Sequence, residues 1–213
     1  VLGPTPSEVL SQAAASGRRA IVVPAFLSRG YHVRTDLPAH VAASGHSNVI
    51  VTPALGPSGE IARIVAHQLM KSGWHPGDSV ILGAAGTSDY RARADLHTTA
   101  TLLSALTGSR VSLGFAATGA PDVHEAVASA RRNGARRVVV ASYLLADGLF
   151  QQRLRGCGAD LVSQPLGCHP GLARLIANRF RRAVPHGSQR PRVRANFVGH
   201  NGLQARHAEA SNA

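Results

Sequence analysis

The stretch "RRVVVASYLLADG", Arg136 to Gly148, decides the fold of this chain of 213 residues. An uninterrupted apolar run of this length, rich in β-branched residues, predicts a strand buried on both faces, as in a parallel sheet. The pattern recurs as "RRAIVVPAFLSRG" from Arg18, at an offset of 118 residues, which is the difference between positions 136 and 18. A second pair, "VTPALGPSGEIARIVAHQL" from Val51 and "VSQPLGCHPGLARLIANRF" from Val162, is offset by 111. The chain therefore contains two copies of one structural unit.

Six short apolar runs predict strands, and amphipathic stretches between them predict helices. The predicted strands are residues 20–27, 48–55, 79–86, 110–118, 137–145 and 159–166. Among the predicted helices are residues 89–106, 121–134 and 171–183. Continuous apolar strands that alternate with helices are typical of parallel sheets covered on both faces. The sequence therefore predicts an α/β protein.

The two copies divide the chain into an N-terminal module, residues 1–77, and a C-terminal module, residues 78–184. The first copy begins only at the helix that precedes its third strand. We therefore expect the first module to be incomplete, lacking a counterpart of residues 79–118 ahead of Val1. Residues 185–213 lack apolar periodicity and are rich in Arg, Asn, Gly and His, so we expect a basic disordered tail.

Composition limits the classes of function. Apolar residues make up 44% of the chain, enough for a packed core, and the sequence contains no apolar run of about 18 residues that could cross a membrane. The net charge of +12 favours a polyanionic partner, either nucleic acid or a small molecule with several carboxylates. Aromatic residues make up only 4%, and the arginines are spread over the helices, which argues against nucleic acid. Cys157 and Cys168 lack CxxC spacing, so we expect buried thiols in a cytoplasmic protein.

The stretch "FLSRGYHVRTDLP", Phe26 to Pro38, contains the first candidate site. His32 follows just beyond the carboxyl end of a predicted strand, which is where open α/β sheets bind their ligands. A lone histidine is usually a solvated or satisfied residue. In the other copy, however, Phe150 stands at this position, so the fold itself does not require an imidazole. This asymmetry favours metal or proton chemistry at His32.

The two charged residues after His32 have alternative interpretations. Asp36 precedes Leu37-Pro38, which favours a helix N-cap, and the alternative is a carboxylate that orients the His32 ring. Arg34 either binds a carboxylate or is simply solvated.

The stretch "AAGTSD", Ala84 to Asp89, joins a predicted strand to a predicted helix. Gly86 permits a tight turn, Thr87 and Ser88 supply hydroxyl groups, and N–H groups at the start of the helix can receive an anion. The alternative is an ordinary Ser or Asp N-cap. Other histidines receive no function: His67, His97 and His124 lie in predicted helices, and His169 in a turn.

Several of these stretches together resemble the sirohydrochlorin chelatases of the class II chelatase superfamily, in the long form with two fused modules. They are "VVPAFLSRGYHVRTDLP", "VTPALGP", "AAGTSD", "VVVASYLLADGLF" and "PLGCHPGLARL". The resemblance implies modules with parallel four-stranded sheets, and a tetrapyrrole in the cleft between them. It implies a lyase-class enzyme without a cofactor that inserts Co²⁺ or Fe²⁺ into sirohydrochlorin, for siroheme or cobalamin biosynthesis.

The resemblance also implies roles for single residues. His32 matches one of two family histidines and becomes the metal ligand and proton acceptor, while Ala85 occupies the position that corresponds internally to the other. The remaining expected site residues are Gly30 and Asp36 as supports, and Tyr31, Arg34, Gly86, Thr87 and Ser88 as substrate-binding groups.

Two further hypotheses stay open. Because only one family histidine is present, the chain could be a non-catalytic remnant that binds a tetrapyrrole or metal, or pairs with another copy as a homo-oligomer. A nucleic-acid-binding protein is the third hypothesis, which rests on the net charge of +12 and on the arginines of residues 185–213.

Overall fold

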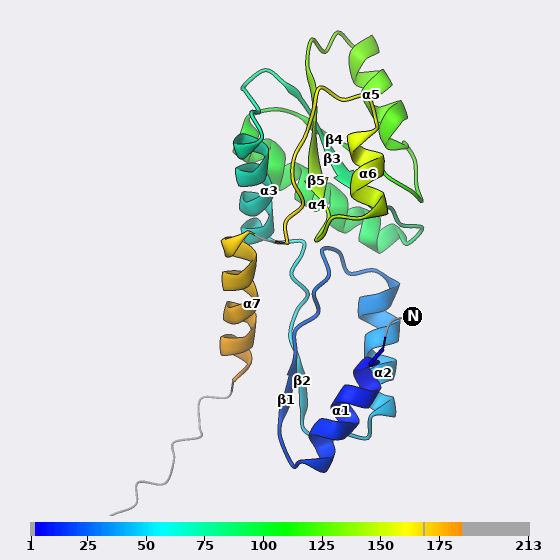
Figure 1. Ribbon diagram of the computed structural model, residues 1–213, viewed down its shortest axis with the longest axis vertical. Helices are drawn as coiled ribbons and strands as arrows, with labels where there is room; N and C mark the ends of the chain where they lie inside the picture. Colours follow the sequence, from blue (N-terminus) through cyan, green and yellow to red (C-terminus); the bar gives the residue numbers. More distant parts are fainter. Residues whose placement is uncertain (1–2, 168, 185–213) are drawn as a thin grey trace, which may run out of the picture.

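The computed structural model describes residues 3–167 and 169–184 (Figure 1). Its larger sheet has four parallel strands in the order β4-β3-β5-β6. The strands are β3 (Ser79–Ala84), β4 (Val111–Phe115), β5 (Val138–Tyr143) and β6 (Leu161–Val162). The central strand β5 is buried along its whole length, as expected of a strand covered on both faces. The predicted α/β fold with parallel sheets is confirmed.

Three helices complete the second module, namely α4 (Tyr90–Thr107), α5 (Val123–Arg132) and α6 (Leu149–Arg155). Helix α5 begins at a capping box. The Asp122 side chain accepts hydrogen bonds from backbone N–H groups of the first turn, and the Glu125 carboxylate accepts one from the Asp122 backbone N–H. Helix α4 begins at Asp89, whose carboxylate accepts from two backbone N–H groups.

The smaller sheet has two parallel strands, β1 (Ala20–Val22) and β2 (Val49–Val51). It is accompanied by α1 (Pro6–Ala15), a π-helical turn η1 (His32–Asp36) and α2 (Leu37–Ala43). The family resemblance implies four strands per module. The first module has two among the described residues, in keeping with the expectation that it is incomplete.

The last helix of each sequence copy contacts elements of the other module (Figure 1). Helix α3 (Gly59–Lys71) follows β2 in the chain but packs against β5 and α4. Helix α7 (Pro170–Ala183) follows β6 but contacts β1, and it also packs against α3. The two modules therefore exchange helices, and α3 and α7 contact each other.

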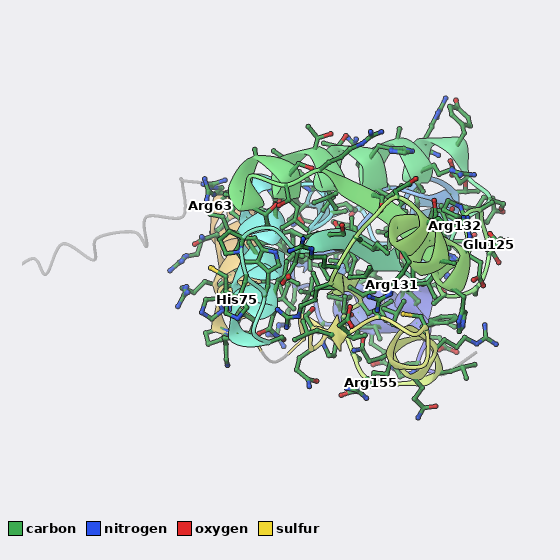
Figure 2. The ribbon with its side chains drawn as sticks, turned by 90° about the horizontal axis from the view of Figure 1, so that it is seen from above. Arg63, His75, Glu125, Arg131, Arg132 and Arg155 are labelled. Carbon is green, nitrogen blue, oxygen red and sulfur yellow. The ribbon has the colours of Figure 1, made fainter. Side chains whose placement is uncertain are left out.

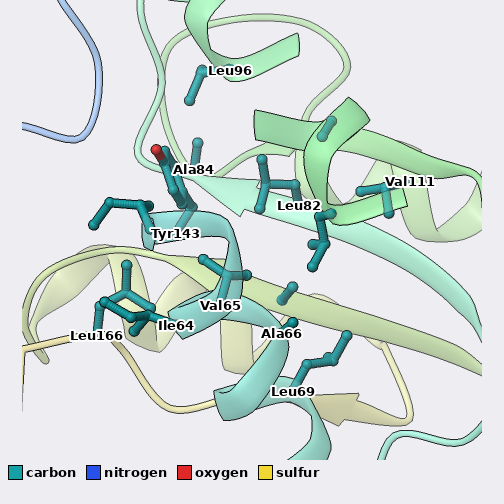
Figure 3. Packing of buried hydrophobic residues seen from close by; sticks show 14 of the residues in the cluster. Ile64, Val65, Ala66, Leu69, Leu82, Ala84, Leu96, Val111, Tyr143 and Leu166 are labelled. Carbon is teal, nitrogen blue, oxygen red and sulfur yellow. The ribbon is translucent and has the colours of Figure 1, made fainter. Parts of the chain in front are cut away.

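The main hydrophobic core lies between α3, α4 and the four-stranded sheet (Figure 3). Val65 and Leu69 of α3 are fully buried against Leu82 of β3, and Leu55 brings the segment after β2 into the same cluster. Full burial of such a side chain contributes about 1.5–3 kcal/mol. The segments that follow β1 and β2 therefore pack into the same hydrophobic core as the larger sheet.

Some expectations concern residues at the edges of the described structure. The expected tail, 185–213, and Cys168 lie outside the described residues, whereas Cys157 is buried as expected. None of the helices in the described ranges is long and apolar enough to cross a membrane.

Candidate functional site at the junction of the modules

The carboxyl ends of β1 and β5 lead to one place at the junction of the two modules. The Tyr143 hydroxyl, at the end of β5, donates to the Leu27 carbonyl oxygen at 2.8 Å and lies 3.1 Å from the Thr99 hydroxyl. Burial raises the pKa of Tyr143, so the phenol remains a donor. A Cβ at Gly56 would lie 2.2 Å from the Leu27 oxygen, so only glycine permits this approach. The segment after β1 is thus held against the second module.

His32 stands in this segment with its ring oriented by a carboxylate. His32 Nδ1 lies 2.5 Å from Asp36 Oδ2. Because an ionised carboxylate only accepts hydrogen bonds, Nδ1 carries the proton in the neutral ring, and Nε2 then has the free lone pair. The ring stacks on Phe26, with centroids 6.1 Å apart, and meets Tyr31 edge-on at 6.2 Å. The imidazole side chain is 73% exposed, so Nε2 is open to a ligand.

The preferred interpretation of Asp36 as a helix N-cap is wrong. Its backbone is helical, with φ −65° and ψ −48°, and its side chain makes no capping bond. Instead the N–H of Leu37 donates to the His32 carbonyl oxygen, which makes the turn π-helical and lets it run directly into α2. Asp36 therefore has the alternative role, as the group that orients the His32 ring.

Arg34 and the "AAGTSD" turn meet across the junction. Arg34 Nη2 donates to Asp89 Oδ2 at 2.6 Å, and this hydrogen bond lowers the pKa of Asp89. The other Asp89 oxygen accepts from the N–H groups of Arg91 and Ala92, at 2.8 and 3.3 Å. The carboxylate of Asp89 thus occupies the helix start where an incoming anion was expected. The alternative, an Asp N-cap, is the one observed.

The other expected site residues lie around the same junction. A Cβ at Gly86, where φ is +123°, would lie 2.2 Å from the Thr118 oxygen, and Thr87 N–H donates to that oxygen at 2.8 Å. Ser88 is exposed, and Tyr31 is 59% exposed beside His32. A Cβ at Gly30 would lie 3.4 Å from the Cβ of Ala92 on α4. Their roles in substrate binding stay predictions.

The strongest link between the modules is one that the sequence did not indicate. Arg29 donates to Asp95 three times, from its backbone N–H at 2.7 Å, from Nε at 3.1 Å and from Nη2 at 2.6 Å. Burial would raise the pKa of Asp95, but these bonds from Arg29 lower it below its ordinary value. The partners are 66 residues apart, and no local spacing marks such a pair.

A small cavity of about 390 Å³ lies between this segment and α4. It is lined by charged residues from both modules, including Arg29, Arg34, Arg91 and Asp95. Arg29 and Arg34 are paired with Asp95 and Asp89, whereas Arg91 forms no ion pair with another described residue and adds a positive charge at this opening. The arrangement can attract carboxylates and present one imidazole lone pair to a metal ion.

The structure also pairs two histidines that sequence reasoning set aside. His169 Nε2 lies 2.8 Å from His67 Nδ1, although 102 residues separate them. Within the described ranges, no group of three or more His, Cys, Asp or Glu side chains is placed to hold a metal ion. Neither this pair nor His32 is therefore a complete metal site by itself.

Comparisons with known proteins identify the family. The CbiX family model matches residues 1–72 and 79–183. Two curated relatives from Priestia megaterium are a sirohydrochlorin ferrochelatase, 24% identical over 178 residues, and a sirohydrochlorin cobaltochelatase, 28% identical over 188. The alignments cover 76% and 83% of this chain, but only 67% and 60% of the relatives. The chain thus spans about two thirds or less of their length.

Solved structures share the fold. SirB from Bacillus subtilis with Fe³⁺ matches with a TM-score of 0.72 at 21% identity, over 85% of this chain and 78% of that one. SirB from Bacillus subtilis subspecies spizizenii in complex with cobalt matches with a TM-score of 0.65 at 21% identity, over 86% and 77%. Because the family model covers most of the sequence, the chain belongs to the CbiX family, and its curated relatives are sirohydrochlorin chelatases.

Proposed function

We propose that this chain inserts Co²⁺ or Fe²⁺ into sirohydrochlorin, with His32 as metal ligand and proton acceptor. The observation that carries the proposal is the His32–Asp36 pair, which leaves Nε2 open at the junction of the modules. The names of the curated relatives supply the substrate, and they include both a ferrochelatase and a cobaltochelatase. Neutral imidazole is a suitable ligand for either metal.

The reaction exchanges one divalent metal ion for two protons. The Nε2 lone pair first holds the ion, and a single protein ligand leaves its other positions free for the macrocycle nitrogens. As the metal binds the four ring nitrogens, the protons of the two nitrogens that carry N–H groups must leave. When the metal has moved to the macrocycle, Nε2 is free to accept one of these protons, and the second proton goes to solvent. Asp36 stabilises the imidazolium ion that results.

The surrounding residues suit a flat polycarboxylate. Phe26 and Tyr31 are 38% and 59% exposed on either side of His32, so their rings are available to contact a macrocycle. Arg34 and Arg91 bring positive charge to the same opening, where they can attract the substrate carboxylates. We propose that Gly86, Thr87 and Ser88 border the substrate without holding an anion at the α4 start, because Asp89 already caps it.

A second candidate function is binding without turnover. Ala85, the internal counterpart of the other family histidine, cannot ligate a metal, and His32 then stands as a single ligand. In this case the junction would hold the tetrapyrrole or the metal but would not release a metallated product.

Anaerobic conversion of sirohydrochlorin with Co²⁺, followed by absorbance, distinguishes the two candidates. We expect turnover above the protein-free rate that is abolished in His32→Ala and retained in His124→Ala, an exposed histidine on α5. Tetrapyrrole binding with rates equal to the protein-free rate in all samples would refute catalysis and support the second candidate. Equal activity in His32→Ala would show that the chemistry lies elsewhere.

A further inference from the structure

A cavity of about 560 Å³ lies between α3 and α7, outside the site described above. Residues of both helices line the cavity. Those on α3 correspond to those on α7 through the offset of 111 residues between the two sequence copies. Each residue on α3 has its repeat counterpart, 111 positions later, on α7 in the same cavity. The four pairs are Glu60 and Gly171, Arg63 and Arg174, Ile64 and Leu175, and His67 and Asn178.

This pairing means that the cavity lies on an approximate twofold axis of the internal repeat. Two copies of one helix that meet at such an axis present the same residues from opposite sides. The equivalent charged pair is Arg63 and Arg174, which both line the space. The buried side chains of Ile64 and Leu175 add apolar surface to the lining.

The charge in and near the cavity is unbalanced. Neither Arg63 nor Arg174 forms an ion pair with another described residue, and Glu60 is the one acidic residue in the lining. Lys71 lies one turn further along α3, in a neighbouring cavity that shares His67. Burial lowers the pKa of His169, and the charges of His67, Arg174 and Lys71 lower it further. The local potential is therefore positive.

The histidine pair at the end of the cavity supplies a further donor. Gly171 N–H donates to His169 Nδ1 at 2.9 Å, so that nitrogen carries no proton in the neutral ring. His169 Nε2 then carries the proton and donates it to His67 Nδ1. Because His67 Nδ1 accepts this hydrogen bond, the proton of neutral His67 is on Nε2. A metal ion on His169 Nε2 would require a proton on Nδ1, which would oppose the Gly171 N–H.

We propose that the cavity between α3 and α7 binds an oxyanion with two or more negative charges, held between Arg63 and Arg174. Guanidinium groups form forked hydrogen bonds to carboxylate and phosphate alike, so the shared chemistry is that of a polycarboxylate or phosphate. His67 and Asn178 add neutral donors from the two sides. A volume of about 560 Å³ is in the ordinary range of small-molecule sites. This site does not depend on the function proposed for His32.

The test uses calorimetric titration of the full chain with inorganic phosphate and, separately, with citrate, at constant ionic strength adjusted with chloride. The variants are Arg63→Gln, Arg174→Gln, the double variant, and Arg132→Gln as the control. Arg132 is an exposed arginine on α5, far from Arg63 in Figure 2. All of the substituted side chains are exposed, and unfolding curves check that each variant remains folded.

We expect one equivalent of at least one of the two anions to bind. Each single glutamine variant should weaken the binding by about tenfold, because one forked contact is lost. The double variant should show no saturable heat, and Arg132→Gln should bind like the unchanged chain. The preferred anion then distinguishes phosphate from carboxylate ligands.

Three results of the anion titrations would overturn the proposal. They are the absence of saturable heat with both anions, binding that the double variant retains, and an equal loss in Arg132→Gln, which would show only a response to net charge. Tight Zn²⁺ binding that is lost in His67→Gln would also overturn it, because the pair would then be a metal site.

Discussion

At the scale of single residues, hydrogen-bond partners determine which nitrogen of a neutral imidazole carries the proton. Asp36 determines this for His32, and the Gly171 N–H determines it for His169. Both assignments follow from hydrogen-bond partners that are four and two residues away in the chain. A π-helical turn and a helix N-cap bring these partners together, and both are local features of the backbone.

Removal of the Asp36 carboxylate should weaken catalysis without removing the metal ligand. In Asp36→Ala, we expect the rate of cobalt insertion to fall by about 10–100-fold, the usual effect of losing a carboxylate behind a ligating histidine. Nitrogen NMR should show His32 changing from the Nδ1-protonated to the Nε2-protonated tautomer. Asp147→Asn, in an exposed ion pair, is the control. An unchanged tautomer in Asp36→Ala would contradict this role.

The pKa of His169 predicts how stability changes with pH. The folded-state pKa is lowered below the ordinary 6.5, mainly by burial, so the folded chain binds fewer protons there than the unfolded chain. The neutral His169 ring therefore contributes to the free energy of unfolding above pH 6.5, and this contribution is lost as pH falls through the folded-state pKa.

We expect urea unfolding to show lower stability on acidification below pH 6.5, and a flatter profile in His169→Asn. Asparagine retains an acceptor for the α7 N-cap but does not titrate. The same acid loss in His169→Asn and in the unchanged chain would show that another group is responsible.

At the scale of elements, the strands were the most predictable features. All six predicted strands are present. Strands that are covered on both faces of a parallel sheet have continuous apolar sequences, which makes them recognisable. The structure shortens β1 and β2 to three residues each, since the backbone leaves the ladder early to reach the junction. Helices α4 and α7 begin and end within a residue or two of their predicted bounds, where Asp89 and His169 cap them.

The turn between β3 and α4 should tolerate no side chain at Gly86. Its φ of +123° is unfavourable for other residues, and a Cβ would meet the Thr118 backbone at 2.2 Å. Gly86→Ala should therefore lower the free energy of unfolding by about 2–4 kcal/mol, measured in urea. Gly108→Ala, which has φ +68° but open space, should cost about 1–2 kcal/mol. Equal losses in both would indicate that the close approach is unimportant.

At the scale of the whole molecule, two modules are held together by exchanged helices and by polar contacts at the junction. Helices α3 and α7 bury apolar faces across the division between the sequence copies. The bonds from Arg29 to Asp95 and from Arg34 to Asp89 then hold the His32 segment against α4. Catalysis at His32 would therefore depend on the second module, although that module contributes no metal ligand at Ala85.

Disruption of the Arg29–Asp95 pair should loosen the His32 segment. Asp95 is only 4% exposed, so Asp95→Asn removes charge from a buried acceptor of three bonds. We expect the unfolding free energy to fall by about 1–3 kcal/mol, and trypsin to cleave faster at Arg29 and Arg34. Asp160→Asn breaks an exposed pair with Arg131 and should leave this cleavage unchanged. Equal cleavage rates in both variants would show that the pair does not hold the segment.

The sequence by itself determined the α/β class, the strands, the repeat and the place of His32 beyond a strand. These are properties of neighbouring residues, and periodicity records them directly. Only the tertiary structure decided that Asp95 accepts hydrogen bonds from Arg29, that His67 lies beside His169, and that Arg63 and Arg174 line one cavity. Each of these pairs brings together residues more than 60 positions apart, from elements that are not neighbours in the chain. Such contacts depend on how whole elements cross, and spacing along the chain does not record that.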